Sequence, residues 1–83
     1  MKYYHRFNIY TRLSEAQTMC LDYDDYKNSN LLNELYDLIQ HEMEILEDFD
    51  NLTTIEKEQI NNFSIYALKV SKNYKELLNY SLN

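Results

Sequence analysis

The chain contains no glycine and no proline among its 83 residues, and this absence constrains its fold more than any motif does. A chain of this length and average composition has about six glycines and four prolines. Without glycine it has no Walker phosphate loop, no GxGxxG dinucleotide turn and no GxSxG nucleophile elbow. Tight hairpin turns that need positive φ are also disfavoured. The sequence therefore predicts helices joined by short polar connections.

The apolar content is sufficient for one small folded domain covering residues 1–83. Leu, Ile, Val and Phe supply 22 residues, about 27% of the chain, which lies above the range typical of disorder. The sequence contains no run of 18 apolar residues, and Met1 is not followed by an apolar leader. We therefore expect neither a membrane span nor a signal peptide. The single cysteine, Cys20, forms no internal disulfide, and a cytoplasmic location is expected.

The first segment alternates between two kinds of residue. One side carries Tyr3, His5, Phe7, Ile9, Thr11 and Leu13, and the other is mostly polar. Aromatic and β-branched residues at period two are typical of a β-strand, so we expect a strand or extended arm over residues 2–13. A helix with an unusual pattern is the alternative interpretation.

The remainder predicts a mainly α fold with about three helices. Ser14 and Gln17 form a capping-box pattern before a short helix over 15–25. Asn30 or Ser29 caps a second helix over about 31–49, which has a wide apolar face. Thr53 and Glu56 form another capping box before a helix that packs antiparallel to the second.

The last predicted helix is long for so small a domain. If it runs unbroken to Leu82, it spans about 42 Å at 1.5 Å per residue. We expect either a break near residues 71–73 or a far end that packs on another subunit.

Charge is distributed unevenly along the sequence, whose net charge is −6. Residues 1–14 carry +3 and residues 59–83 carry +2, whereas residues 15–58 carry −11. Basic residues thus lie on separate segments, which disfavours direct nucleic-acid binding.

The acidic residues of the second helix are ordered. Glu34, Asp37, Glu44 and Asp48, with His41 between them, lie on one predicted helix face opposite the apolar face. Like charges at this spacing destabilise a helix, and anions near its C-terminus oppose the helix dipole. Acids and aromatic rings also alternate just before this helix. The candidate partner-binding residues are therefore Asp22, Tyr23, Asp24, Asp25, Tyr26, Glu34, Asp37, Glu44 and Asp48, with Tyr36 as a further aromatic anchor.

Catalytic and metal chemistry find little support. His41 with Asp37 or Glu44 has metal-ligand spacing, but no second helix supplies a matching set. Cys20 has no histidine at a local spacing and is expected to be a small core residue. We therefore expect no enzyme activity, no metal and no cofactor.

The expected function is protein binding, through an anionic helix face that docks on a basic, nucleic-acid-binding surface of a target protein. Asn, Lys, Ile and Tyr, which have AT-rich codons, supply 31 residues. In size, acidity and codon-biased composition the chain is similar to small phage-encoded inhibitors of host defence nucleases, such as anti-CRISPR proteins. That resemblance implies a nuclease or similar target and a nucleic-acid mimic. The alternatives are a homodimer formed through the C-terminal helix or N-terminal strand, a bacteriocin-immunity-like helical bundle, and an acidic face that is only solvated.

Overall fold

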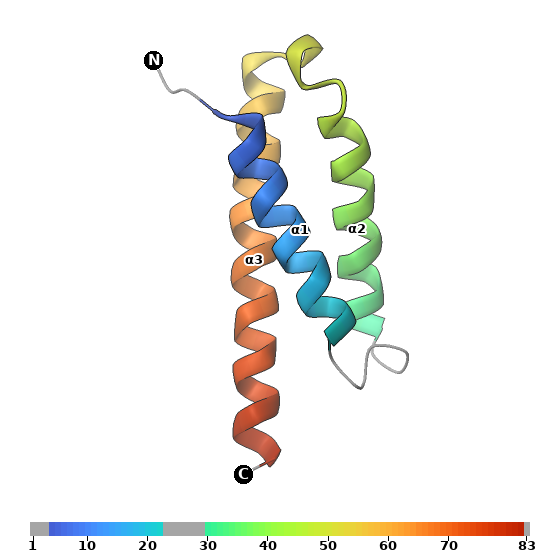
Figure 1. The fold of residues 1–83 in the computed structure, drawn as a ribbon, viewed down its shortest axis with the longest axis vertical. Helices are drawn as coiled ribbons and strands as arrows, with labels where there is room; N and C mark the ends of the chain where they lie inside the picture. Colours follow the sequence, from blue (N-terminus) through green and yellow to red (C-terminus); the bar gives the residue numbers. More distant parts are fainter. Residues whose placement is uncertain (1–3, 23–29, 83) are drawn as a thin grey trace.

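The protein is a bundle of three helices. The computed structural model describes residues 4–22 and 30–82, without the side chains of residues 75 and 77–82. Its elements are α1 (Arg6–Asp22), α2 (Asn30–Leu46), a short 3-10 helix η2 (Phe49–Asn51) and α3 (Thr54–Leu82). Each α-helix runs opposite to the one before it (Figure 1). The prediction of a mainly α fold with three helices is confirmed.

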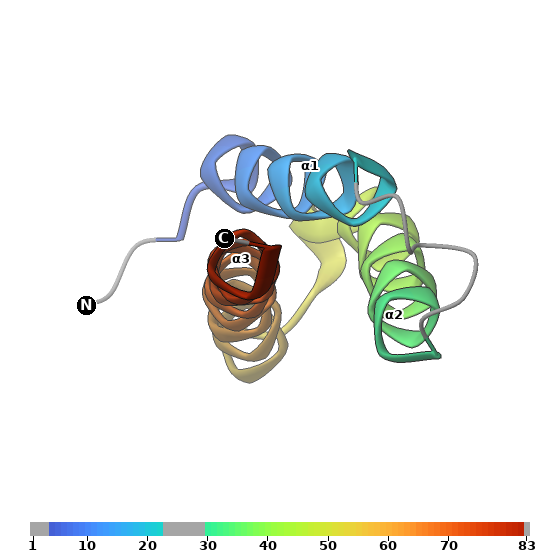
Figure 2. The same cartoon turned by 90° about the horizontal axis from the view of Figure 1, so that it is seen from below.

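Helix α1 holds the bundle together. It packs against both other helices, whereas α2 and α3 contact each other less. Seen from below, α1 spans α2 and α3, which both lie on one side of it (Figure 2). The core therefore lies beneath α1.

The strand predicted over residues 2–13 is wrong for the part that the structure describes, because Arg6–Asp22 is one helix. Ile9, Leu13, Ala16 and Cys20 are fully buried along it. A separation of four residues, as between Ile9 and Leu13, fits both a period of two and a helical period of 3.6. The alternation was therefore ambiguous, and the continuation to Ala16 and Cys20 identifies the helix. Residues 1–3 lie outside the described part.

The capping box predicted at Ser14 is also wrong. Ser14 lies in the middle of α1, where the preceding turn is already helical. The predicted helix over 15–25 is thus the second half of a longer helix that ends at Asp22, and residues 23–25 are not described.

Small side chains bring α1 and α3 together. The α3 residues that face α1 include Ser64, Ala67 and Ser71, all fully buried. The Ser71 hydroxyl donates to the Ala67 carbonyl oxygen at 2.9 Å, which satisfies a polar group inside the core. Small residues on both helices allow a close approach of their backbones.

The second predicted helix is confirmed as α2, but α2 is shorter than the predicted range of about 31–49. It ends at Leu46, and Phe49 is buried from the separate element η2. Leu32, Leu35, Ile39 and Leu46 are buried. Leu31 and Leu38, which the sequence placed on the same apolar face, are both 53% exposed. The buried face of α2 is therefore narrower than its apolar face.

The predicted capping box at Thr53 is confirmed. The Glu56 backbone N–H donates to Thr53 Oγ1 at 3.1 Å, and the Thr53 N–H donates to Glu56 Oε1 at 3.0 Å. The two bonds satisfy two backbone donors at the start of α3.

Helix α3 has no break at residues 71–73. Its 29 residues correspond to about 43 Å of helix, against 17 residues each for α1 and α2. Its C-terminal end extends beyond the other two helices (Figure 1). Of the two expected outcomes, the break is therefore wrong, and packing on another subunit stays a prediction.

Candidate protein-binding surface

The outer face of α2 carries the acidic residues singled out from the sequence. Glu34, Asp37 and Glu44 are exposed on this helix, and His41 is exposed between them. Asp48 is also exposed but lies past the end of α2. Its carboxylate accepts a hydrogen bond from Asn51 Nδ2 at 2.6 Å. At 100° per residue, the three acidic residues within α2 and His41 fall in a sector of about 80°, and the three acidic residues span about 15 Å along the axis.

The three exposed acidic residues of α2 have no compensating contact in the described part of the chain. Within that part, the side-chain carboxylates of Glu34, Asp37 and Glu44 take part in no salt bridge or hydrogen bond. The repulsion between neighbouring carboxylates is therefore not offset by any described basic side chain of α1 or α3.

Two exposed leucines adjoin the acidic residues. Leu31 and Leu38 are one heptad apart, about 40–60° around the helix axis from Glu34. Ile45 continues this line and is half-buried. The α2 surface, defined as Glu34, Asp37, Glu44, Asp48, Leu31 and Leu38, therefore combines negative charge with exposed apolar groups.

The other predicted binding residues lie elsewhere. Asp22 is exposed at the end of α1, a different helix. The segment from Tyr23 to Tyr26 falls outside the described residues. Tyr36 is half-buried and packs against the core, so its proposed role as an exposed anchor is wrong. At 100° per residue, position 36 lies about 160° around the helix axis from Glu34 and about 100° from Asp37.

Arg6 offsets part of the unfavourable charge at the end of α2. Its Nε donates a hydrogen bond to the Leu46 carbonyl oxygen at 3.2 Å, over a separation of 40 residues. A cation at a helix C-terminus interacts favourably with the dipole. This contact stabilises the end of α2, but it does not neutralise the carboxylates on the outer face of the helix.

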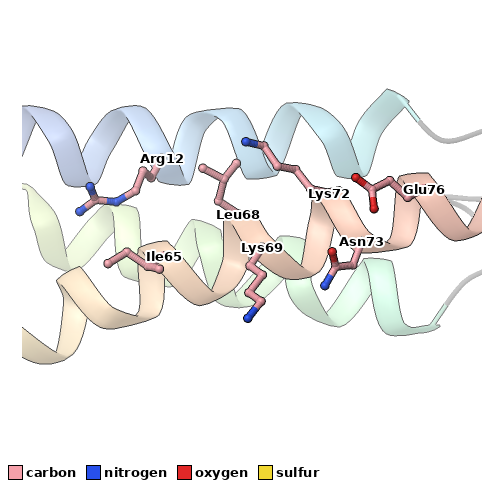
Figure 3. A pocket seen from close by; sticks show the side chains of 7 residues that line it. All are labelled: Arg12, Ile65, Leu68, Lys69, Lys72, Asn73 and Glu76. Atoms are coloured by element: carbon pink, nitrogen blue, oxygen red, sulfur yellow. The ribbon is translucent and has the colours of Figure 1, made fainter.

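A basic groove lies between α1 and α3. It has a volume of about 290 Å³ and is lined by Arg12, Ile65, Leu68, Lys69, Lys72, Asn73 and Glu76. The fold thus brings Arg12 close to Lys69 and Lys72, which the sequence places on a separate segment. Figure 3 shows the Lys69 and Lys72 side chains extending in opposite directions. The cations do not converge on one point, and the groove lacks the geometry of a small-anion site.

Arg12 has a structural role that the sequence did not reveal. Its Nε donates to Ser64 Oγ at 2.8 Å, and its Nη2 donates to Asn61 Oδ1. Ser64 in turn donates to the Asn61 carbonyl oxygen at 2.6 Å. The only sequence signal for this network is polar residues at helical spacing among the α3 core positions.

Reactive and metal-binding groups are scarce in the described part. There, no group of three or more His, Cys, Asp or Glu residues could hold a metal ion. Cys20 is buried, and this burial raises the pKa of its thiol, partly opposed by Ser71. None of the described helices is both long and apolar enough to cross a membrane.

Comparison of the chain with protein-family models, curated proteins and solved structures finds no match.

Proposed function

We propose that this protein binds another protein, and that the α2 surface docks on a basic region of that partner. The observation that carries the proposal is that the carboxylates of Glu34, Asp37 and Glu44 are exposed and form no side-chain hydrogen bond or salt bridge with the described residues. They lie beside two exposed leucines. Charges arranged in this way steer association with positive surfaces. The leucines supply the apolar contact that desolvates on binding.

The acidic residues set the expected partner chemistry. The three carboxylates are separated along the helix axis by about 4.5 and 10.5 Å, compared with 3.4 Å per phosphate along one DNA strand. The carboxylates are therefore farther apart than the phosphates of a DNA strand, although they also lie along one line. A nucleic-acid-binding protein, such as a nuclease, offers the basic surface that this arrangement fits, and the protein would then act as an inhibitor or regulator.

The expected strength of the charge term can be estimated. Exposed ion pairs contribute about 0.5 kcal/mol each, so four pairs contribute about 2 kcal/mol, or about 30-fold in affinity. This contribution is screened by salt.

The test uses two variants that remove the same charge. The surface variant replaces Glu34 and Glu44 with Gln and replaces Asp37 and Asp48 with Asn. The control variant neutralises four exposed acidic residues elsewhere, replacing Glu15, Glu47 and Glu58 with Gln and Asp50 with Asn. Both variants have the same net charge, so a difference between them reports the location of the charge.

Each protein is immobilised, and proteins captured from a lysate of its own cells are identified and quantified. We expect wild type and control to retain a basic protein that the surface variant loses, with unchanged circular dichroism. Equal capture by all three proteins would reject the proposal. Equal loss by both variants would show that only net charge matters and would also reject it.

A further inference from the structure

The groove between α1 and α3 is positively charged, although the whole chain has a net charge of −6. Arg12, Lys69 and Lys72 line it with a single acid, Glu76, so three cations and one anion give a charge of +2. The hydrogen bonds of Arg12 go to neutral side chains, and among the described residues no carboxylate forms a salt bridge with any of the three cations. The groove is therefore suited to an acidic occupant.

The cations of the groove are spread along α3. The Arg12 guanidinium is bonded to Ser64, and Lys69 and Lys72 lie about 7.5 and 12 Å farther along α3 than Ser64. The apolar residues between these levels are the exposed Ile65 and the half-buried Leu68. A fitting occupant therefore has two carboxylates about 8–12 Å apart, with an apolar side chain between them.

The α2 surface has this pattern. Asp37 and Glu44 lie about 10.5 Å apart along α2, and the exposed Leu38 lies between them along the axis. The three residues fall in a sector of about 120° around the helix. A helix that packs against other helices buries a sector of about 100° or more, so both kinds of side chain can contact the groove. The α2 surface and the groove are therefore complementary in charge and in spacing.

These two surfaces lie on opposite sides of the bundle. Gln17 of α1 donates a hydrogen bond to Gln40 of α2 at 2.8 Å, whereas Arg12 of α1 is bonded to α3. Positions 12 and 17 are about 140° apart around α1, so the groove opens on the flank of α1 away from α2. In Figure 3, which looks into the groove, α2 lies behind the other two helices. The α2 surface therefore cannot reach the groove of its own chain.

We propose that copies of this chain associate head to tail, with the α2 surface of one copy on the groove of the next. The proposal rests on the same α2 surface as the proposed function and adds a second occupant for it. Because the contact joins two different surfaces, two-fold symmetry does not close it, and further copies can add. The α2 surfaces of neighbouring copies also do not meet, which limits the repulsion between acidic chains.

Head-to-tail association regulates the α2 surface by covering it. A basic partner needs the same surface, so it competes with the groove and releases single copies of the chain. The contact consists of one helix in one groove and buries less than the roughly 800 Å² per partner of a standard interface. The association is therefore weak and gives way to a partner that binds more tightly.

Sedimentation equilibrium from about 10 µM to about 1 mM measures the association. The surface variant removes one side of the contact, and a groove variant with Lys69→Gln and Lys72→Gln removes the other and leaves Arg12 intact. We expect the wild-type average mass to rise beyond that of a dimer, and each variant to associate at least about fivefold more weakly. The control variant, which has the net charge of the surface variant, keeps the association. A wild-type protein that stays monomeric at the highest concentration overturns the proposal.

A mixture of the surface variant and the groove variant tests the arrangement. The groove variant retains the α2 surface and the surface variant retains the groove, so each supplies the side that the other lacks. The mixture should form a 1:1 dimer that adds no further copies. A mixture that stays monomeric overturns the head-to-tail contact, and so does either variant if it associates alone as strongly as the wild type. Circular dichroism verifies that each variant keeps its helix content.

A gain of association tests the groove separately. Glu76→Gln raises the charge of the groove from +2 to +3 and should strengthen the association about twofold, more than Glu58→Gln on the same helix does. Equal effects of the two changes would place the contact elsewhere and overturn the proposal.

The same proteins distinguish this inference from the proposed function. If the wild type stays monomeric while the surface variant loses a basic partner, only the head-to-tail contact is overturned. If both variants lose self-association while no basic protein is captured, the head-to-tail contact is supported and the proposed function is rejected.

Discussion

Arg12 on α1 and Ser64 on α3 are joined by a 2.8 Å hydrogen bond across 52 residues of sequence. Ser64 is fully buried and Arg12 is half-buried. The same guanidinium donates to Asn61, so a single side chain sets the register between the two helices. These bonds add a polar connection between α1 and α3 to the contact made by their small buried residues.

Replacing Arg12 with Met should destabilise the protein by about 2 kcal/mol, because hydrogen bonds to charged groups contribute about 1.5–3 kcal/mol. Methionine keeps an apolar stem of similar length, which limits the loss of packing. The free energy of unfolding is measured by urea denaturation. Lys69→Met, which removes an exposed cation from the same groove, is the control. Equal destabilisation by the two variants would show that the Arg12 network does not stabilise the fold.

The capping box makes stability depend on pH. The hydrogen bonds from the Thr53 backbone N–H and then from its side chain lower the pKa of Glu56. The unfolded pKa is about 4.3, so the contribution of the ionised carboxylate is complete above that pH. It is lost as the pH falls through the lower folded pKa. Wild type should therefore be more stable than Glu56→Gln at pH 7 and similar to it near about pH 2.5.

Urea midpoints at the two pH values measure this difference. Glu58→Gln, an exposed change one turn into the same helix, is the control and should show a smaller pH-dependent difference. A gap between wild type and Glu56→Gln that persists unchanged at the lower pH would contradict the assignment.

Cys20 should react slowly with thiol reagents in the folded protein. Its side chain is buried beside Ser71, and burial raises the pKa of the thiol. Since the thiolate is the reactive form, both access and ionisation limit the reaction. Labelling with a chromogenic disulfide should be much slower than for Leu21→Cys in a Cys20→Ala background. Comparable rates for these adjacent positions would mean that Cys20 is accessible.

The close packing of α1 on α3 should not tolerate a larger side chain. Ala67 is fully buried between the two helices. Ala67→Leu should cost about 1–3 kcal/mol by overpacking. Lys69→Leu, two residues away and exposed, should change the free energy of unfolding by less than about 0.5 kcal/mol. Thermal or urea unfolding of the two variants gives the comparison, and a stable Ala67→Leu protein would disprove tight packing at this position.

The sequence predicted the elements whose signals are local. The Thr53 capping box and the helix after Asn30 are present because each depends on residues within a few positions. The first helix was misassigned because Ile9 and Leu13 satisfy both periods and because aromatic residues at 7 and 10 favour a strand. Those aromatic residues do not face the core, since Phe7 is 76% exposed and Tyr10 is 49% exposed.

Burial and long-range contacts lay beyond sequence reasoning. The acidic face of α2 was correctly placed opposite the apolar one, but the exposure of Leu31 and Leu38 depends on how the other helices pack against α2. The Arg12 network connects residues about 50 positions apart, and no local pattern signals it. The grouping of Arg12 with Lys69 and Lys72 has the same origin in the tertiary fold.

The role of the α2 surface in binding is tested most directly by the affinity of the purified partner for the two variants that have the same net charge. Titration calorimetry at about 0.15 M salt compares wild type, the α2 surface variant and the control variant. We expect about 30-fold weaker binding for the surface variant and a change of less than about threefold for the control. Equal affinities of the two variants for the partner would contradict it, because they would show that the outer face of α2 does not form the contact.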